Sequence, residues 1–319
     1  MDIKDIKVGM ALEGTDLLVD SIREAVTKNG KPYATISLRD ATASVDAKLW
    51  DYDKTKHACL QKGHVAKIWA SVEEFAGRPQ LSIKDATTST KKPEDFLRKS
   101  EFDLEKMWDD LLQMIQGFKE PLTKFVAEEL LIKQAQVLDL YKRAPAANKV
   151  HNAWIGGVLE HSHAMATLAK PVVAHYRKYC PKLSEDKVLF GCIVHDIGKI
   201  AEYNVNSPSF DYTPAGLLTP HLVSGPAWVM EAANRWTGPK DQVFKSERME
   251  LMHIIAAHHG KLEWGSPCPP ATIEAIIVHM LDYEDSQIMH AVEMIQGKAG
   301  TIPGFSERSW VMGTSFKQN

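Results

Sequence analysis

The spacing of apolar residues changes once along this chain, near residue 100, and this change constrains the fold more than any other feature of the sequence. In residues 33–38 apolar and polar side chains alternate, a period of two that is typical of strands. From Leu104 to Ile115 apolar residues recur three and four positions apart, the period of a helix. The 319 residues suffice for about two domains. We therefore expect a multi-domain α+β chain with a β-rich first part and an all-α second part.

The β-rich part contains five short runs with strand character. Asn29-Gly30 and Ala76-Gly77 mark turns between neighbouring runs. Residues 53–61 form a connection of helical character between the third and fourth runs. Five strands with one such connection are typical of a small Greek-key barrel of the OB type. We assign residues 1–90 to this barrel, 91–100 to a polar linker and 101–319 to the helical domain.

The second part reads as a series of helices separated by glycine and proline clusters, with no internal repeat. The predicted helices cover residues 104–115, 121–142, 157–178, 185–203, 222–236, 247–258 and 270–297.

Charge and composition narrow the function classes. Lysine plus arginine number 38 and aspartate plus glutamate 41, a net charge of −3, which argues against nucleic-acid binding through bulk positive charge but leaves local basic patches open. No apolar stretch reaches the roughly 18 residues of a membrane helix and the N-terminus has no signal-peptide pattern, so we expect no membrane contact. Four widely spaced cysteines predict neither disulfides nor a cysteine zinc site, which favours a cytoplasmic protein.

Histidine is distributed unevenly, because 11 of the 13 histidines follow residue 150. The central motif is His195-Asp196, which follows an apolar run. Burial of a charged aspartate without a partner costs several kcal/mol. A divalent metal removes this cost, and both neighbours reach it if the helix is locally distorted. The motif therefore predicts a metal site.

Further histidines and carboxylates complete an ordered set of candidate ligands: His161, His195, Asp196, His221, His258 and Asp282. His259 is left open, since adjacent side chains of a helix diverge by about 100°. His279 shares a helix face with Asp282 and either orients a ligand or belongs to the core; the role of Asp285 is also open. Mixed histidine and carboxylate ligands suit manganese, iron, zinc or magnesium, ions that promote phosphoester hydrolysis. Lys199 either binds a substrate phosphate or pairs with Glu202.

These motifs resemble the HD-domain metal-dependent phosphohydrolases, and the whole chain resembles the YhaM family of 3′→5′ exoribonucleases. The resemblance covers nearly all 319 residues. Its most specific segments are AKLWD at 47–51, IGGVLEHS at 155–162, VHDIGK at 194–199, YTPAGLLTPH at 212–221 and AAHHGKLEWGSP at 256–267.

The resemblance implies one or two divalent ions, typically Mn²⁺, with Mg²⁺, Fe²⁺ or Zn²⁺ open. It assigns His161, His195, Asp196 and Asp282 to the principal ion, and His221, His258 and His259 to a second. Asp196 and Lys199 would act in catalysis, Lys199 on the phosphate. Two segments depart from the family pattern, Thr219-Pro220 before His221 and Tyr283-Glu284 after Asp282.

The barrel of such a chain is expected to bind single strands, because OB folds stack bases on aromatic rings beside basic side chains. The candidates for stacking are Tyr33, Trp50, Trp69 and Phe75, with Lys48 and Arg78 nearby. Several of these aromatic residues must belong to the core, and we expect only Tyr33 and Trp50 to be exposed.

The favoured function is a metal-dependent 3′→5′ exonuclease that hydrolyses single-stranded RNA to nucleoside 5′-monophosphates, with single-stranded DNA left open. One alternative is an HD-domain phosphohydrolase acting on nucleotides or cyclic dinucleotides. Another is a non-catalytic single-strand-binding accessory protein. The sequence leaves open whether the chain forms a homo-oligomer.

Overall fold

The computed structural model describes residues 2–147, 153–205, 207, 210–297 and 299–318. The chain divides into two compact units, one of Met1–Lys99 with Asn206–Asp211 and the other of Ser100–Val205 with Tyr212–Asn319. We refer to them as the barrel unit and the helical unit, and describe each by itself.

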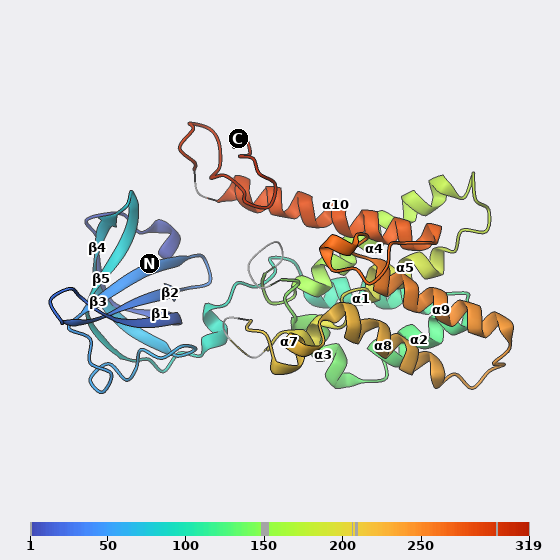
Figure 1. Cartoon of the computed structure of the whole chain (residues 1–319), viewed down its shortest axis with the longest axis horizontal. Helices are drawn as coiled ribbons and strands as arrows, with labels where there is room; N and C mark the ends of the chain where they lie inside the picture. Colours follow the sequence, from blue (N-terminus) through green and yellow to red (C-terminus); the bar gives the residue numbers. More distant parts are fainter. Residues whose placement is uncertain (1, 148–152, 206, 208–209, 298, 319) are drawn as a thin grey trace. The chain divides into compact units, whose positions relative to one another are not determined.

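The barrel unit is a closed barrel of five strands, β1 (Ala11–Val26), β2 (Pro32–Arg39), β3 (Ser44–Trp50), β4 (Val65–Phe75) and β5 (Arg78–Thr88) (Figure 1). Their order around the barrel is β1-β2-β3-β5-β4. The β3–β5 pair is parallel, and the four other neighbouring pairs are antiparallel. A closed five-stranded Greek-key barrel is the architecture of the OB fold. The predicted fold of the first domain is confirmed.

Alternation along the strands builds the barrel core. On β2, Ile36 and the residues two positions to either side have no exposed surface. The long strand β1 pairs with β2 and with β4, and its pairing with β4 shifts register around Gly14. Gly14 has a φ of 72°, and a β-carbon there would lie 2.9 Å from the ring of Trp69. Glycine is thus required where this strand bends.

The connection between β3 and β4 differs from the prediction. Residues 53–61 form a series of turns and no helix. The carboxylate of Asp53 accepts hydrogen bonds from the amides of Thr55 and Lys56 at 2.8 and 2.9 Å, and the buried side chain of Leu60 anchors the far end. So short a segment buries too little surface to extend a helix, since helix formation is cooperative and depends on packing.

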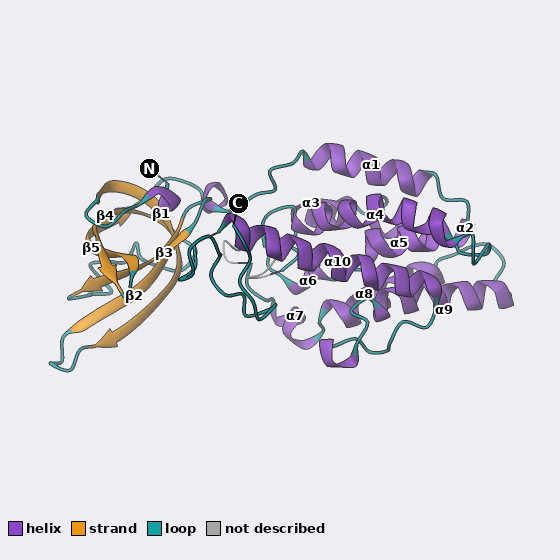
Figure 2. Ribbon diagram, turned by 90° about the horizontal axis from the view of Figure 1, so that it is seen from above, coloured by secondary structure: helices purple, strands orange, loops and turns teal. Residues whose placement is uncertain are grey.

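The helical unit is all-α (Figure 2). Its helices are α1 (Leu104–Gln116), α2 (Pro121–Leu131), α3 (Ala135–Arg143), α4 (Gly157–Tyr176), α5 (Glu185–Val194), α6 (Lys199–Glu202), α7 (Pro214–Leu218), α8 (His221–Asn234), α9 (Gln242–Ala257) and α10 (Ile273–Gln296). One continuous hydrophobic core joins α1–α6 with α8, α9 and α10, and the long helix α10 packs against α4, α5 and α9. Short 3₁₀ segments occur at Ile3–Asp5, Pro93–Phe96 and Leu262–Trp264.

Several helices end where the apolar period continues. The predicted helix 121–142 is two helices, α2 and α3, and the predicted helix 185–203 is interrupted between α5 and α6. Helix α7 was not predicted; it begins at Thr213, whose hydroxyl accepts a hydrogen bond from the amide of Gly216. Among the described residues, no helix combines the length and the apolar character that crossing a membrane requires.

Candidate metal centre

The helical unit brings all seven predicted ligand residues to one place. They come from α4 (His161), the turn after α5 (His195 and Asp196), the start of α8 (His221), the end of α9 (His258 and His259) and α10 (Asp282). Within the described residues, three groups have ligand atoms that lie within 4.8 Å of one another: His161 with His195 and Asp282, His195 with Asp196 and His258, and His221 with His258 and His259. The groups share members, so they form one continuous cluster.

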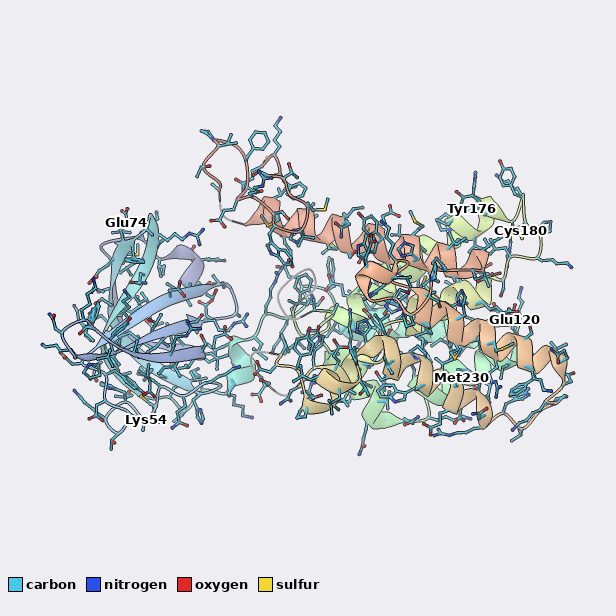
Figure 3. The ribbon with its side chains drawn as sticks, in the orientation of Figure 1. Lys54, Glu74, Glu120, Tyr176, Cys180 and Met230 are labelled. Carbon is cyan, nitrogen blue, oxygen red and sulfur yellow. The ribbon has the colours of Figure 1, made fainter. Side chains whose placement is uncertain are left out.

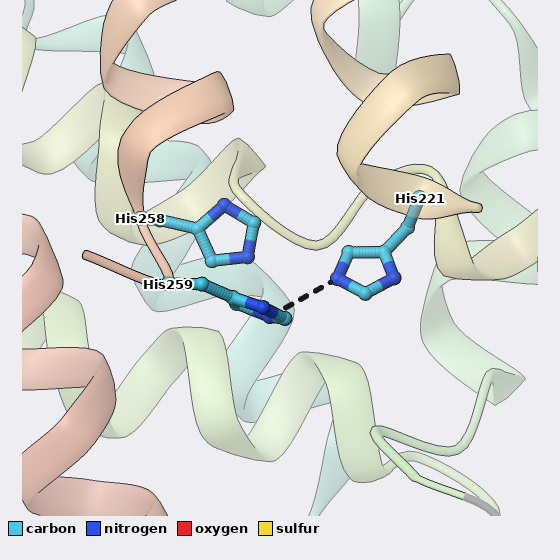
Figure 4. A group of neighbouring side chains, drawn as sticks. All are labelled: His221, His258 and His259. Carbon is cyan, nitrogen blue, oxygen red and sulfur yellow. Dashed lines mark hydrogen bonds between the residues drawn. The ribbon is translucent and has the colours of Figure 1, made fainter. Parts of the chain in front are cut away.

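Helix ends explain how neighbouring residues reach the same site. Helix α5 ends at Val194, so His195 and Asp196 lie in a turn and both point into the cluster. Helix α9 ends at Ala257 in the same manner. The divergence of about 100° expected between adjacent helical side chains therefore does not apply to His258 and His259. Figure 4 shows both rings beside His221. The Nε2 atoms of His221 and His259 are 3.3 Å apart.

Asp196 lies at the centre of the cluster and is only 2% exposed. Its Oδ1 atom is 3.7 Å from the Nε2 atoms of both His221 and His258, and its Oδ2 atom is 3.3 Å from Nε2 of His195. Oδ1 of Asp196 and the Nε2 atoms of His195 and His258 are buried without any hydrogen-bond partner. Buried polar atoms normally have partners. Three buried atoms of ligand type that face one another without hydrogen-bond partners are suited to bind divalent cations.

The ring nitrogen that faces away from the cluster, Nδ1, lies close to a backbone carbonyl oxygen in three of these histidines. Nδ1 of His195 lies 3.2 Å from the carbonyl oxygen of Cys192, and Nδ1 of His258 lies 2.6 Å from that of Ile255. Nδ1 of His259 lies 2.8 Å from the carbonyl oxygen of Trp264. Such bonds place the proton on Nδ1 and leave Nε2 free to ligate, as in most histidine metal sites.

Two carboxylates that were not predicted as ligands hold the remaining imidazoles. Nδ1 of His161 lies 2.6 Å from Asp285, and Nδ1 of His221 lies 2.7 Å from Glu202. The sequence leaves the role of Asp285 open and suggests Glu202 only as a partner for Lys199. The spacing between Glu202 and His221 carries no helical signal, since α7 lies between them, so sequence reasoning could not find this pair.

His279 orients the backbone at the end of α9. Its Nδ1 atom lies 2.8 Å from the carbonyl oxygen of His258. Gly260 follows at a φ of 78°, and a β-carbon there would lie 2.2 Å from the His279 ring. Of the two open interpretations of His279, the structure thus favours the orienting one.

The electrostatics of the cluster attract positive charge. Burial raises the pKa of Asp196, but the Lys199 ammonium and the His195 imidazole outweigh it and hold the pKa well below its usual value. Burial lowers the pKa of His161, but its hydrogen bonds with Asp282 and Asp285 outweigh burial and raise it to about 10. A cation is therefore favoured between these carboxylates.

Other imidazoles in the cluster are held neutral. Burial, reinforced by the neighbouring imidazole of His195, lowers the pKa of His258 well below its usual value. Burial also lowers the pKa of His259. A neutral imidazole is the form that ligates a metal, so these groups are prepared for binding without loss of a proton.

A cleft of about 660 Å³ opens onto the cluster. Asp196, His221, His259 and Asp282 contribute to its lining, together with Lys199. The Lys199 ammonium is 2.6 Å from Oδ2 of Asp196. The expected alternative partner of Lys199 was Glu202, but the residue that it contacts is Asp196.

Comparison with known proteins identifies this arrangement. The HD domain family model matches residues 158–287, which include all seven predicted ligands. The 3′-5′ exoribonuclease YhaM of Halalkalibacterium halodurans is 33% identical over 311 residues, which cover 95% of this chain and 91% of that protein. The YhaM of Bacillus subtilis is 31% identical over 277 residues, which cover 85% and 84%. This chain belongs to the YhaM family.

Solved structures similar to the chain include OB-fold domains. One is the second OB-fold domain of replication protein A from Methanococcus maripaludis, with 17% identity, a TM-score of 0.22, and coverage of 29% of this chain and 96% of that one. Another is an OB domain from Thermoplasma acidophilum, with 18% identity, a TM-score of 0.23, and coverage of 29% and 88%.

The barrel of this YhaM-family chain exposes Trp50 as predicted, whereas Tyr33 is half-buried and not exposed as expected. Tyr33 and Trp50 are directly paired across β2 and β3, with ring centroids 5.4 Å apart, and Trp50 is 50% exposed. The Lys48 ammonium lies 5.4 Å from the ring centroid of Trp50 and 4.7 Å from that of Phe75.

The expectation that only Tyr33 and Trp50 of the four candidate aromatic residues are exposed is wrong for Phe75. Phe75 is 57% exposed because β4 extends beyond the barrel at this end, and Trp69 is half-buried against Gly14. Arg78, exposed at the start of β5, follows directly in the same hairpin. Trp154 is 3% exposed, and its indole donates to Glu160, so it is a buried residue of the helical unit.

Proposed function

We propose that this chain is a divalent-metal-dependent 3′→5′ exoribonuclease that hydrolyses single-stranded RNA to nucleoside 5′-monophosphates. The observation that carries the proposal is the buried Asp196 carboxylate among imidazole Nε2 atoms that have no hydrogen-bond partner. The family of the chain supports the reaction class, since its curated relatives are named 3′-5′ exoribonucleases.

The ligand atoms divide between two cation positions. His161, His195 and Asp282 form one group, and His221, His258 and His259 form the other. Asp196 would contribute to both, because its two carboxylate oxygens face different groups. Manganese is the ion we propose, since mixed histidine and carboxylate ligands suit it. Bound divalent ions lower the pKa of water and polarise phosphoryl oxygens, which is the chemistry that phosphodiester hydrolysis needs.

The residues of this chain supply position and charge. Asp285 and Glu202 fix the orientations of His161 and His221. Lys199 lines the cleft, and its ammonium is available to neutralise charge on the scissile phosphate while holding Asp196 in place.

The barrel supplies recognition of the strand. In OB folds the β2–β3 face and the β4–β5 loop bind oligonucleotides, and this chain has Tyr33, Lys48 and Trp50 on the first and Phe75 and Arg78 at the second. Stacking accepts every base, so the barrel would bind RNA and single-stranded DNA alike. We also propose a cytoplasmic location, in keeping with four free cysteines.

End-labelled strands test the function. The full chain is incubated with RNA and DNA single strands of the same sequence, labelled at either end, with Mn²⁺, Mg²⁺ or Zn²⁺. Stepwise shortening of 5′-labelled RNA, with release of labelled mononucleotide from the 3′ label, is the expected result. Absence of shortening with every ion, or full activity of Asp196→Ala, would refute the proposal.

The same assay separates the two alternatives. Hydrolysis of free nucleotides or cyclic dinucleotides without strand shortening would indicate a small-molecule phosphohydrolase. Strand binding without either reaction, in a protein that binds no divalent ion, would indicate an accessory protein.

A further inference from the structure

An aromatic pair lies beside the metal centre, and its rings have no part in the roles assigned above. Trp264 ends the 3₁₀ segment Leu262–Trp264, and Tyr283 lies on α10. Their rings are nearly parallel, with an interplanar angle of 9° and centroids 5.3 Å apart. Each residue is 41% exposed, and both line the cleft that contains the cluster. The pair therefore offers aromatic surface to whatever occupies the cleft.

The position of the pair relative to the cluster is fixed on both sides. The carbonyl oxygen of Trp264 is the group that holds Nδ1 of His259. Tyr283 directly follows Asp282 on α10, and adjacent helical side chains diverge by about 100°. Tyr283 consequently flanks the ligand cluster instead of pointing at it.

Tyr283 is the member of the pair with room for another ring. The Lys261 ammonium lies 4.3 Å from the ring centroid of Trp264. Among the described residues, the ring contacts of Tyr283 are the stacked Trp264 and a tilted His279 at 6.4 Å. A planar group entering the cleft can therefore extend the stack from the Tyr283 side.

We propose that Tyr283, backed by Trp264, is the platform on which the base of the 3′-terminal nucleotide stacks. The proposal rests on the proposed function and adds the subsite for the nucleotide that is released. The phosphate would lie at the cluster beside Lys199, and the base on the ring next to it. The cleft volume of about 660 Å³ lies within the range of roughly 300–1,000 Å³ usual for small-ligand sites, which suits a strand end.

The platform makes the subsite tolerant of base identity. Stacking on an aromatic ring does not depend on the hydrogen-bond pattern of a base, since every base has a π-face. We therefore expect all four ribonucleotides to occupy the subsite, and a sugar phosphate without a base to bind more weakly.

Calorimetric titration tests the platform without turnover. The full chain loaded with Mn²⁺ is titrated with AMP and, separately, with ribose 5-phosphate, which has no base. Wild-type protein is expected to bind AMP more tightly. Tyr283→Leu is expected to lower the AMP affinity roughly 5- to 150-fold, the range of one base–aromatic stack. Its affinity for ribose 5-phosphate should stay within about twofold of the wild-type value.

Matched variants control the experiment. Tyr283→Phe keeps the ring and should retain AMP affinity. Tyr179→Leu removes a tyrosine that is 78% exposed and does not line the cleft; it lies between Tyr176, the last residue of α4, and Cys180, both of which are labelled in Figure 3. It should bind both ligands as wild type does. Trp264→Leu removes the backing ring and should weaken AMP binding less than Tyr283→Leu, which gives a second measure if Tyr283→Leu binds less Mn²⁺.

Three outcomes would overturn the platform. They are unchanged AMP affinity in Tyr283→Leu, equal loss of AMP and ribose 5-phosphate, and a base-dependent loss in Trp310→Leu alone. Trp310 is the competing ring, since it also lines the cleft and is 83% exposed. Failure of the exonuclease proposal would show separately, as wild-type protein that binds AMP in this manner but does not shorten RNA.

Discussion

The two units of this chain treat an aspartate in opposite ways. In the barrel unit, Asp40 is half-buried, and its oxygens accept hydrogen bonds from the amides of Ile3, Thr42 and Ala43 at 2.6–2.9 Å. In the helical unit, Asp196 is 2% exposed, and its Oδ1 atom accepts no hydrogen bond. The first carboxylate stabilises a turn, whereas the second is kept for a ligand.

Lack of a partner is not by itself the distinguishing feature. The described residues of the barrel unit also include two such atoms, Oδ1 of Asp16 and Nε of Arg39. In the helical unit the orphans of His195, Asp196 and His258 belong to one group whose ligand atoms lie within 4.8 Å. A functional site is therefore indicated where several buried ligand atoms without hydrogen-bond partners lie close together. Each such atom lowers the stability of the fold by about 1–3 kcal/mol, so several in one place point to a bound ligand.

The largest expected effect comes from removing the central carboxylate. Asp196→Asn should lower the rate of strand shortening by more than about 100-fold, because it weakens ligation of both ions and the charge stabilisation they supply. Binding of single strands through the barrel should be unchanged. Rates from gel assays and fluorescence anisotropy of a labelled strand in EDTA measure the two quantities. A parallel loss of strand binding would break the separation of roles between the units.

Metal removal should affect one unit alone. Mn²⁺ at about 100 times its dissociation constant should stabilise the helical unit by about 2.7 kcal/mol, and EDTA should reverse this. Hydrogen exchange followed by mass spectrometry should show the added protection in peptides from residues 158–287, where the cluster lies. Equal changes in peptides from β1 to β5 would contradict a metal site confined to the helical unit.

Removal of one exposed ring of the barrel should weaken recognition without affecting chemistry. Trp50→Ala is expected to lower affinity for long single strands roughly 5- to 150-fold, the range of one base–aromatic stack. The turnover number at saturating substrate should not change, because Trp50 belongs to the barrel unit and the cluster does not. Val8→Ala, which shortens a side chain that is 51% exposed, serves as the control. A lower turnover number in Trp50→Ala would contradict the assignment.

The smallest expected effect concerns the stability of the barrel unit and arises at Asp40, whose carboxylate has hydrogen-bond partners. Burial raises the pKa of Asp40, but its hydrogen bonds to Thr42 and to backbone amides outweigh burial and lower the pKa below the ordinary 3.8. A lowered folded-state pKa stabilises the protein fully above the unfolded-state value, and this contribution is lost as the pH falls through the folded-state value.

Asp40→Asn should therefore destabilise the barrel by about 1 kcal/mol or less at pH 7, a figure reduced by solvent screening. The difference from wild type should shrink as the pH falls below 3.8 toward the lowered pKa at which the folded wild-type carboxyl takes up its proton. Urea unfolding of both proteins at pH 7 and at a pH below 3.8 measures this difference in stability. A difference that grows toward low pH would show that the sign is wrong.

Much of the fold could be predicted because it depends on local patterns. Alternation on β2 and three-four spacing in α1 follow from the residues themselves, and both elements form where expected. Helix ends were less predictable. The break after Val194 interrupts a run whose apolar period continues into α6, so packing and hydrogen bonds with other segments decide it.

In the candidate site, too, some features could be predicted from the sequence and others depend on contacts between distant segments. The seven candidate ligand residues could be identified from the sequence, but the position of His259 depended on a helix ending one residue before His258. Asp285 and Glu202 gained their roles only through contacts with His161 and His221, which are 124 and 19 residues away. The Trp264–Tyr283 stack joins segments that have no common period.

The sequence by itself determined the order of a β-barrel and a helical domain, the YhaM family, and the types of ligand available, because these depend on residue identity and spacing. Only the tertiary structure decided which nitrogen of each imidazole faces the cluster, that Asp196 lies among unpaired Nε2 atoms, and that an exposed aromatic pair stands beside it. The physical reason is that hydrogen bonds and stacking between distant segments depend on distances that only the packed helices establish.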